Sequence, residues 1–273
     1  MIAGTAVALL ARRWPRVDGR PDEPVRGFAR RLDPEEATGL ALTVALVLLV
    51  GGGLVLGALA LVVRSDPDAI ALDASAARWG DAHATAFTTS VLQHFTNVGV
   101  PRSIVLLAVA LAIVETIRTR SRWIAPFLLV VVAGNGVITT TIKHLADRVR
   151  PSFNPVADTL GPSFPSGHSS WSAAFFAAAA LVLARHAPRR TRVVLAGVAA
   201  GFAVAIAASR VLLDVHWLSD VVAGLALGWA WFAVCAIAFG GRLLRFGATA
   251  EQALGTEEDR APARAERPPA GVR

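Results

Sequence analysis

The chain has 273 residues, 54% of which are hydrophobic, and its mean hydropathy is +0.53. Ordinary soluble domains contain about 45–50% apolar residues, so the composition excludes an ordinary soluble domain. The formal net charge is +7. A nucleic-acid-binding protein would gather this charge on one soluble face, whereas here the arginines stand beside long apolar runs. We therefore expect no nucleic acid partner.

Six apolar runs predict helices that cross a membrane. In chain order they span residues 40–63, 101–117, 123–145, 169–185, 193–213 and 217–239. A span needs about 20 mostly apolar residues, which the first, third, fifth and sixth runs supply. The second and fourth are near the lower limit and are expected to tilt or to be flanked by interfacial turns. The predicted fold is all-α, a bundle of six transmembrane helices in one domain, residues 40–240.

The two ends of the chain differ in composition from the apolar runs. Residues 12–36 and 247–273 are rich in Arg, Pro, Asp and Glu, and we expect the ends 1–39 and 241–273 to be tails that are disordered over these polar stretches. Cys235 is the only cysteine and falls in the last apolar run. An intrachain disulfide is thereby excluded, and a buried inert thiol is expected.

The distribution of the cations predicts the orientation in the membrane. Of the 27 Lys and Arg residues, 20 lie in the two tails and in the turns 118–122 and 185–192, which share one side of a six-span topology. The positive-inside rule makes that side cytoplasmic. Both termini are then cytoplasmic, in a multi-pass protein of the plasma (inner) membrane. The active site is expected at the extracytoplasmic end of the bundle.

The segment 64–100 joins the first two predicted spans on the outer side. Trp79 and Phe87 suit an interfacial helix that borders a lipid access path. A plain connecting loop with a surface helix fits the same residues. His83 and His94 have no partner pattern, and we interpret them as structural.

Lys143, the only lysine, opens the first of three segments that carry chemistry. Arg150 follows seven residues later, which is two helical turns, so both cations share one face if the helix continues. Pro151 disfavours further helix and marks where the chain leaves it. Cations at the end of a span are often interface anchors, so this pair alone does not indicate a site.

The second segment, residues 165–168, reads Pro-Ser-Gly-His at the start of the fourth run. Gly167 lets a ligand approach the backbone, and free N–H groups at a helix start bind phosphate. Ser166 can cap the helix or donate to a phosphate oxygen. His168 stands where a general acid is needed. An ordinary Ser-Gly helix start with an exposed histidine is the alternative.

The third segment contains Arg210, His216 and Asp220. The i,i+4 spacing of His216 and Asp220 lets the carboxylate accept a hydrogen bond from the imidazole. Such a partner fixes which ring nitrogen is free and stabilises the charge formed when that nitrogen attacks. Arg210, across a short outer turn, is close enough to clamp a phosphate.

His168, His216 and Asp220 could also be interpreted as metal ligands. Three cations, Lys143, Arg150 and Arg210, would then surround the same point. They would repel a divalent metal ion and neutralise a phosphate dianion. We therefore expect neither a metal nor another cofactor.

Together these segments resemble the three-part signature of the type 2 phosphatidic acid phosphatase family, whose superfamily includes the vanadium haloperoxidases. Eleven positions match in order, listed as Lys143, Arg150, Pro151, Pro165, Ser166, Gly167, His168, Ser209, Arg210, His216 and Asp220. The resemblance covers roughly residues 40–240. Any one segment is weak, and the ordered set is specific.

The resemblance implies a role for each position. His216 would be the nucleophile that forms a phosphohistidine, and Asp220 would orient it. His168 would protonate the leaving group and then activate water. The phosphoryl oxygens would be held by Lys143, Arg150, Arg210, Ser166 and the backbone at Gly167.

The predicted function is metal-independent hydrolysis of a lipid phosphomonoester or diphosphate in the bilayer. The substrate is expected to be a polyprenyl diphosphate or a lipid of the phosphatidic acid or phosphatidylglycerophosphate type. A lipid phosphotransferase with the same site and a non-catalytic lipid-binding or transport protein are alternatives. Arg148 could bind a second phosphate or a headgroup, or be a solvated charge. Asp214 could pair with Arg210 or modulate the site.

Overall fold

The computed structural model describes residues 34–65, 71–151 and 161–243. The chain divides into two compact units, 1–37 and 38–273, and the elements that carry the site belong to the second. The tails predicted for 1–39 and 241–273 fall almost wholly outside the described residues. Their disorder therefore stays a prediction.

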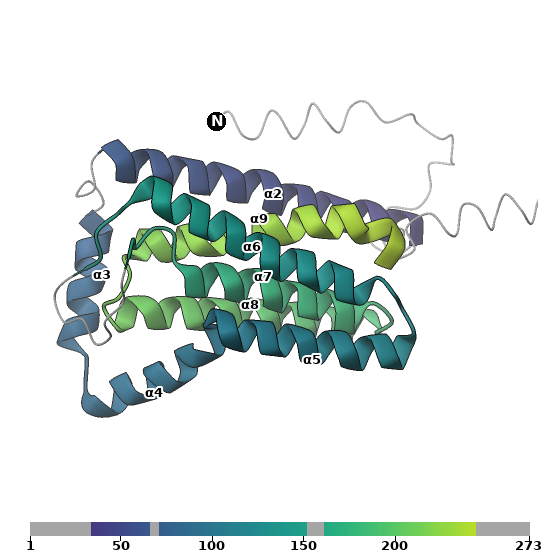
Figure 1. Ribbon diagram of the computed structural model, residues 1–273. Helices are drawn as coiled ribbons and strands as arrows, with labels where there is room; N and C mark the ends of the chain where they lie inside the picture. The colour runs from purple at the N-terminus through teal and green to yellow at the C-terminus, as the bar shows by residue number, and fades with distance from the viewer. Residues whose placement is uncertain (1–33, 66–70, 152–160, 244–273) are drawn as a thin grey trace, which may run out of the picture. The chain divides into compact units, whose positions relative to one another are not determined.

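All regular structure in the described ranges is helical, which confirms the all-α prediction (Figure 1). The elements are α2 (Pro34–Ser65), α3 (Ala71–Ala82), α4 (Ala86–Thr96), the short 3-10 helix η3 (Asn97–Gly99), α5 (Pro101–Thr119), α6 (Ile124–Ala146), α7 (Gly167–Ala184), α8 (Arg189–Leu212) and α9 (Leu218–Leu243). Each of the six predicted runs corresponds to one long helix. Several helices extend beyond their apolar runs, as α2 does at Pro34 and α8 at Arg189.

Five helices are long and apolar enough to cross a membrane, judged by length and composition. They are α2 from Thr43 onward, α6, α7, α8, and α9 as far as Gly240. The helix α5 reaches this standard only together with the preceding Ala86–Gly99, from which it is bent by 50°. Alone, α5 does not reach the standard because its apolar run is short: Arg102, Glu115 and Arg118 lie near its two ends. The bundle therefore has five spans, or six if that bent pair is one span.

The segment between the first two predicted spans is mostly helical. Thr85 begins α4 with a capping box, in which its hydroxyl and that of Thr88 each accept a backbone N–H. Trp79 and Phe87 are 57% and 78% exposed, as an interfacial helix requires. In Figure 1, α3 and α4 lie at the end of the bundle where α6 leads into α7 and α8 into α9. A lipid access path beside them stays a prediction.

The helix α7 is the centre of the packing, with α6, α8 and α9 against it (Figure 1). Gly224 and Gly228 of α9 face the backbone of α7, where an added Cβ would collide with the carbonyl oxygens of Ser166 and Ser170. Any larger residue at either glycine would push the two helices apart. This close approach fixes the first turn of α7 against the second and third turns of α9.

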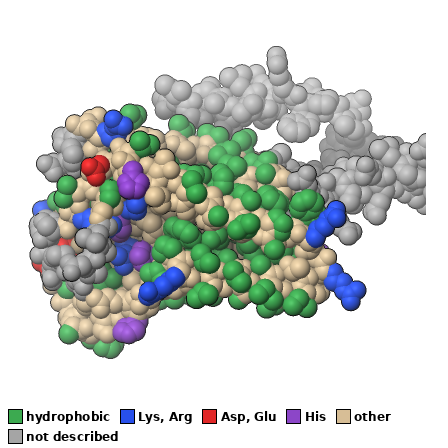
Figure 2. All heavy atoms as spheres, viewed as in Figure 1, with side chains coloured by type: hydrophobic (Ala, Val, Ile, Leu, Met, Phe, Trp, Pro, Cys, Tyr) green, Lys and Arg blue, Asp and Glu red, His purple; other side chains and the backbone are tan. Residues whose placement is uncertain are grey.

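Apolar side chains cover the middle of the face seen in Figure 2, basic side chains lie at both ends, and histidine side chains gather at the left end. Exposed apolar residues are numerous on the predicted spans, including Leu54 at 69% and Leu129 at 67%. Such a band suits contact with lipid. Cys235 is buried beside Phe127 and Val131, as predicted for an inert thiol.

Candidate active site

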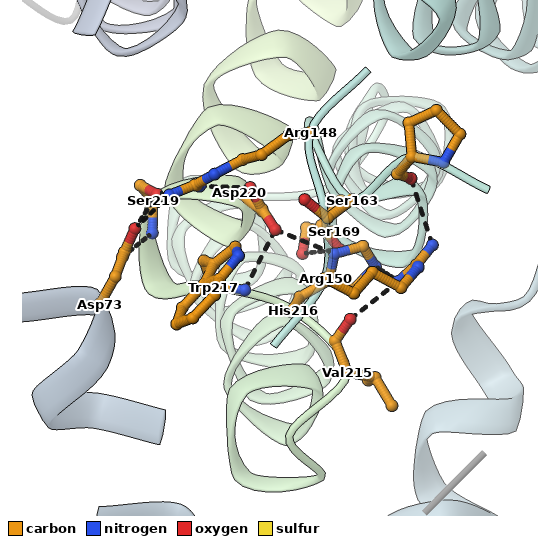
Figure 3. A network of polar contacts seen from close by, with 12 residues as sticks. Asp73, Arg148, Arg150, Ser163, Ser169, Val215, His216, Trp217, Ser219 and Asp220 are labelled. Atoms are coloured by element: carbon orange, nitrogen blue, oxygen red, sulfur yellow. Dashed lines mark hydrogen bonds and ion pairs between the residues drawn. The ribbon is translucent and has the colours of Figure 1, made fainter. Parts of the chain in front are cut away.

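The three predicted segments meet at one end of the bundle, where α3 also lies (Figures 1 and 3). The side chains come from four helices and their flanking segments. Lys143 lies at the end of α6 and Arg150 just after it, while Ser166 and His168 lie at the start of α7. Arg210 lies at the end of α8, and His216 and Asp220 lie at the start of α9. Segments far apart in the sequence thus contribute to one site.

His216 and Asp220 form the pair expected from their spacing. Nδ1 of His216 lies 3.3 Å from Oδ2 of Asp220, and both side chains are buried. Oδ2 also accepts the backbone N–H of Trp217 at 3.0 Å. Asp220 lies in the first turn of α9, where the helix dipole favours a negative charge.

The partners of His216 assign its tautomer. Nε2 lies 3.2 Å from Nη1 of Arg150, and a guanidinium can only donate, so Nε2 accepts. The carboxylate of Asp220, paired with Arg148, can only accept, so Nδ1 donates. His216 is therefore neutral, with its proton on Nδ1 and the lone pair of Nε2 directed at Arg150.

Burial lowers the pKa of His216 to about 4. The hydrogen bond to Asp220 and the negative charge of that carboxylate oppose the shift, while the charges of Arg150 and Lys143 add to it. The lowered pKa lies below the ordinary histidine value of about 6.5 and well below 7, so the ring of His216 is neutral at neutral pH. The neutral ring is the form that can attack phosphorus.

Lys143 and Arg150 are held by backbone carbonyls of the segment 161–163. Nζ of Lys143 donates to the carbonyl oxygens of Pro162 at 2.7 Å and Ser163 at 3.3 Å. Arg150 donates to the carbonyl oxygens of Gly161 at 3.0 Å and Pro162 at 3.2 Å. Burial lowers the pKa of Arg150, but a guanidinium keeps its charge in a protein. The carbonyls thus hold two cations beside the lone pair of His216.

Arg150 is also fixed from the other side of the site, because Nη1 donates to the carbonyl oxygen of Val215 at 2.8 Å. Arg210 is 5% exposed, and its Nη1 donates to the hydroxyl of Thr96 at 3.3 Å. Its buried Nε–H has no partner among the described residues. That donor is available to an anion.

The start of α7 presents His168 and free backbone N–H groups. Ser166 is the N-cap residue, but its side chain makes no capping hydrogen bond and instead accepts from Oγ of Ser169 at 3.0 Å. The backbone N–H of Ser166 donates to the carbonyl oxygen of Asp220 at 2.9 Å, which ties this turn to α9. His168 is half-buried, and the positive charge of Arg210 acts on it.

Two sequence interpretations need correction or restriction. Arg148 is neither a solvated charge nor available to a second phosphate, because it is 6% exposed and pairs with Asp220 at 2.7 Å and Asp73 at 2.9 Å. Asp73, 75 residues away, had no spacing pattern that could reveal this contact. Asp214 is buried in a left-handed turn with φ of 54°, and its role stays open.

The same structure shows the surroundings of His83 and His94 and bears on the metal alternative. Nδ1 of His83 lies 2.8 Å from the carbonyl oxygen of Trp79 in α3, and Nδ1 of His94 lies 2.8 Å from that of Ser90 in α4. Their structural role stays a prediction. His168, His216 and Asp220 do not form a cluster of metal-binding side chains in the described ranges. The expectation that no metal takes part stays a prediction.

Comparison with known proteins finds a match to one family. Residues 125–243 match the model of the PAP2 superfamily. The matched residues make up less than half of the chain. The matched segment contains all eleven signature positions, so the resemblance found in the sequence is confirmed. The helices α2 to α5 precede it.

Relatives and a solved structure extend the match. The chain is 34% identical over 114 residues to phosphatidylglycerophosphatase B of Bacillus subtilis (strain 168), covering 40% of this chain and 55% of that protein. It is 35% identical over 122 residues to a lipid A 1-phosphatase of Rhizobium johnstonii, covering 41% and 46%. The chain therefore spans about half the length of these curated relatives.

A crystal structure of a transmembrane PAP2-type phosphatidylglycerolphosphate phosphatase from Bacillus subtilis superposes with a TM-score of 0.68. The match has 25% sequence identity and covers 73% of this chain and 99% of that one. Together with the apolar helices, this likeness indicates an integral membrane protein.

The assigned protonation state can be tested by nitrogen NMR of histidine-labelled protein in detergent, with His216→Gln to assign the signals. At pH 7 the ring of His216 should be neutral and protonated on Nδ1. Because burial lowers its pKa, the ring should gain a second proton only as the pH falls toward about 4. A histidine peptide in the same sample should titrate near about 6.5. A midpoint above 6, or a proton on Nε2, would contradict the assignment.

Proposed function

We propose that this protein is a membrane lipid phosphatase that works through a phosphohistidine at His216. The observation that carries the proposal is the lone pair of Nε2, which is free of a proton and directed at the guanidinium of Arg150 at 3.2 Å. A nucleophile aimed at an anion-binding group is what attack on a phosphate requires. The PAP2 family match and the phosphatases among the relatives support the same reaction.

In the first step Nε2 of His216 attacks phosphorus, and the bond from phosphorus to the lipid oxygen breaks. His168 gives its proton to that oxygen. The ring of His216 becomes positively charged, and the carboxylate of Asp220 at 3.3 Å stabilises it. In the second step His168 takes a proton from water, the oxygen of that water bonds to phosphorus, and the bond from Nε2 to phosphorus breaks.

The phosphoryl oxygens are held by cations and by backbone donors. Lys143, Arg150 and Arg210 supply the charge, and Ser166 with the N–H groups at Gly167 supplies further donors at a helix N-terminus. Phosphoryl transfer depends mainly on such positioning and charge neutralisation. The free Nε–H of Arg210 and the rotatable ammonium of Lys143 can turn to the substrate without unfolding the site.

The proposed substrate is a membrane lipid that carries a phosphomonoester. The relatives are named for phosphatidylglycerophosphate and for the 1-phosphate of lipid A, which are both phosphate groups on lipids. Arg148, the cation considered for a second phosphate, is already paired with two carboxylates. This pairing leaves Arg148 unable to bind the second phosphate of a polyprenyl diphosphate, so we place that lipid second to the phosphomonoesters in the assay below.

We also propose that the end with α3, α4 and the site is extracytoplasmic, as the distribution of arginines indicates. Cys235 is the only thiol, so a Cys235→Ser background allows single cysteines to be placed at will. Ala84, between α3 and α4, and Arg190, near the start of α8, are both exposed. An impermeant maleimide should label Ala84→Cys in intact cells and Arg190→Cys only after permeabilisation. The reverse pattern would place the site in the cytoplasm.

The activity is tested by phosphate release from the purified protein in detergent with EDTA. Phosphatidic acid and phosphatidylglycerophosphate should be hydrolysed faster than undecaprenyl diphosphate. His216→Ala should reduce release to background because the nucleophile is gone. Arg150→Ala should lower kcat/KM by about 10²-fold or more, the usual effect of removing one donor to the reacting phosphate.

The matched control is Arg102→Ala, which removes an exposed arginine at the start of α5 and should leave the rate unchanged. Release that persists in His216→Ala would rule out the histidine mechanism. Loss of all release in EDTA, restored by zinc, would point to metal catalysis instead. Faster release from undecaprenyl diphosphate would overturn the substrate preference.

A further inference from the structure

The carboxylate that orients His216 is itself held by a buried ion pair. Nη1 of Arg148 donates to Oδ1 of Asp220 at 2.7 Å, on the opposite side of the carboxylate from His216. Oδ2 of Asp220 is left to accept from Nδ1 of His216 and from the backbone N–H of Trp217. The two oxygens thus have separate partners. The position of Arg148 therefore fixes the plane of the carboxylate that His216 contacts (Figure 3).

Arg148 is in turn held by Asp73, a residue of α3. Nη2 of Arg148 donates to Oδ2 of Asp73 at 2.9 Å, and the face of the guanidinium lies 5.5 Å from the ring of Trp217. An arginine side chain is long and flexible, so a single carboxylate partner would not fix its direction. With carboxylates at both Nη atoms, and with the hydroxyl of Ser219 also accepting from Nη1 at 2.7 Å, the guanidinium is fixed between them.

Asp73 is anchored to the same helix that carries Asp220. Its Oδ1 accepts the backbone N–H of Ser219 at 2.8 Å, and its Oδ2 accepts the hydroxyl of Ser219. The N–H groups in the first turn of a helix have no partner within the helix, and a carboxylate there is favoured. Asp73 thus caps α9 from another helix and is only 3% exposed.

The helix α3 presents Asp73 from a packed face. Its buried residues are Asp73, Ala77 and Gly80, whose spacing of four and three residues defines one face. That face packs on α8 and α9. The helix precedes the segment 125–243 that matches the PAP2 superfamily, so the signature does not include this contact.

We propose that Asp73 is a positioning residue for the nucleophile, acting through Arg148 on Asp220 and so on His216. The proposal rests on the phosphatase function proposed above. It makes the docking of α3 a condition for an oriented His216, although no atom of α3 takes part in the reaction. Loss of the Asp73 charge frees Arg148 to turn, and Asp220 then loses the partner that fixes its plane.

The test compares Asp73→Asn with Asp81→Asn, which makes the same change at an exposed position of the same helix. Asp73→Asn should lower kcat by about 10-fold or more, the usual scale for an outer partner of an active-site ligand. The affinity for inorganic phosphate should stay unchanged, because Lys143, Arg150 and Arg210 are untouched. The nitrogen NMR signals of His216 should show a loss of the single Nδ1–H tautomer. Asp81→Asn should match the wild type in all three measurements.

A double variant separates action through Arg148 from any other route. In an Arg148→Gln background, Asp73→Asn should cause no further fall in kcat, because the intermediate residue is already gone. An additive loss would overturn the proposal. An unchanged kcat with an unchanged NMR spectrum would do so as well. Equal losses of kcat and phosphate affinity would also overturn it, since they indicate general damage to the fold.

Failure of the proposed function would be distinguishable. If the wild type hydrolyses no lipid phosphate, the phosphatase function is wrong, and the NMR comparison still decides whether Asp73 orients His216. If hydrolysis is normal and the His216 signals are the same in Asp73→Asn, only the positioning role is wrong.

Discussion

Asp220 is completely buried in the first turn of α9, and a buried carboxylate is unfavourable unless each oxygen is paired. Arg148 pairs one oxygen at 2.7 Å, and His216 with the backbone of Trp217 pairs the other. The same contacts that satisfy the carboxylate decide the tautomer of His216. The contacts that offset the burial of this charge therefore also fix the direction of the Nε2 lone pair.

The packing of α7 on α9 places the remaining groups relative to that pair. The backbone N–H of Ser166 donates to the carbonyl oxygen of Asp220 at 2.9 Å, so the helix start that bears His168 is tied directly to the residue that pairs with His216. Gly224 allows this approach because a side chain there would meet the carbonyl of Ser166. A rigid helix pair is a more precise support for such a site than a loop.

The sequence predicts what depends on local spacing and composition. The long apolar runs become the long helices, and the i,i+4 spacing of His216 and Asp220 gives their hydrogen bond. Long-range contacts could not be predicted. Asp73 and Arg148 are 75 residues apart, and an arginine just beyond a span is ordinarily solvated, so only the docking of α3 reveals the ion pair. The shortness of the apolar run at 101–117 predicts a tilt or flanking turns there, but not the angle of 50° between α5 and the preceding Ala86–Gly99.

The most direct measurement is a search for the covalent intermediate in His168→Ala with 4-nitrophenyl phosphate. This leaving group needs no proton, so the first step should proceed while water attack is slow without His168. If His216 is the nucleophile, one nitrophenolate per protein should appear in a burst. Mass spectrometry after an alkaline quench should then find the phosphate on Nε2 of His216. A phosphate on another residue, or a burst that survives His216→Ala, would contradict the mechanism.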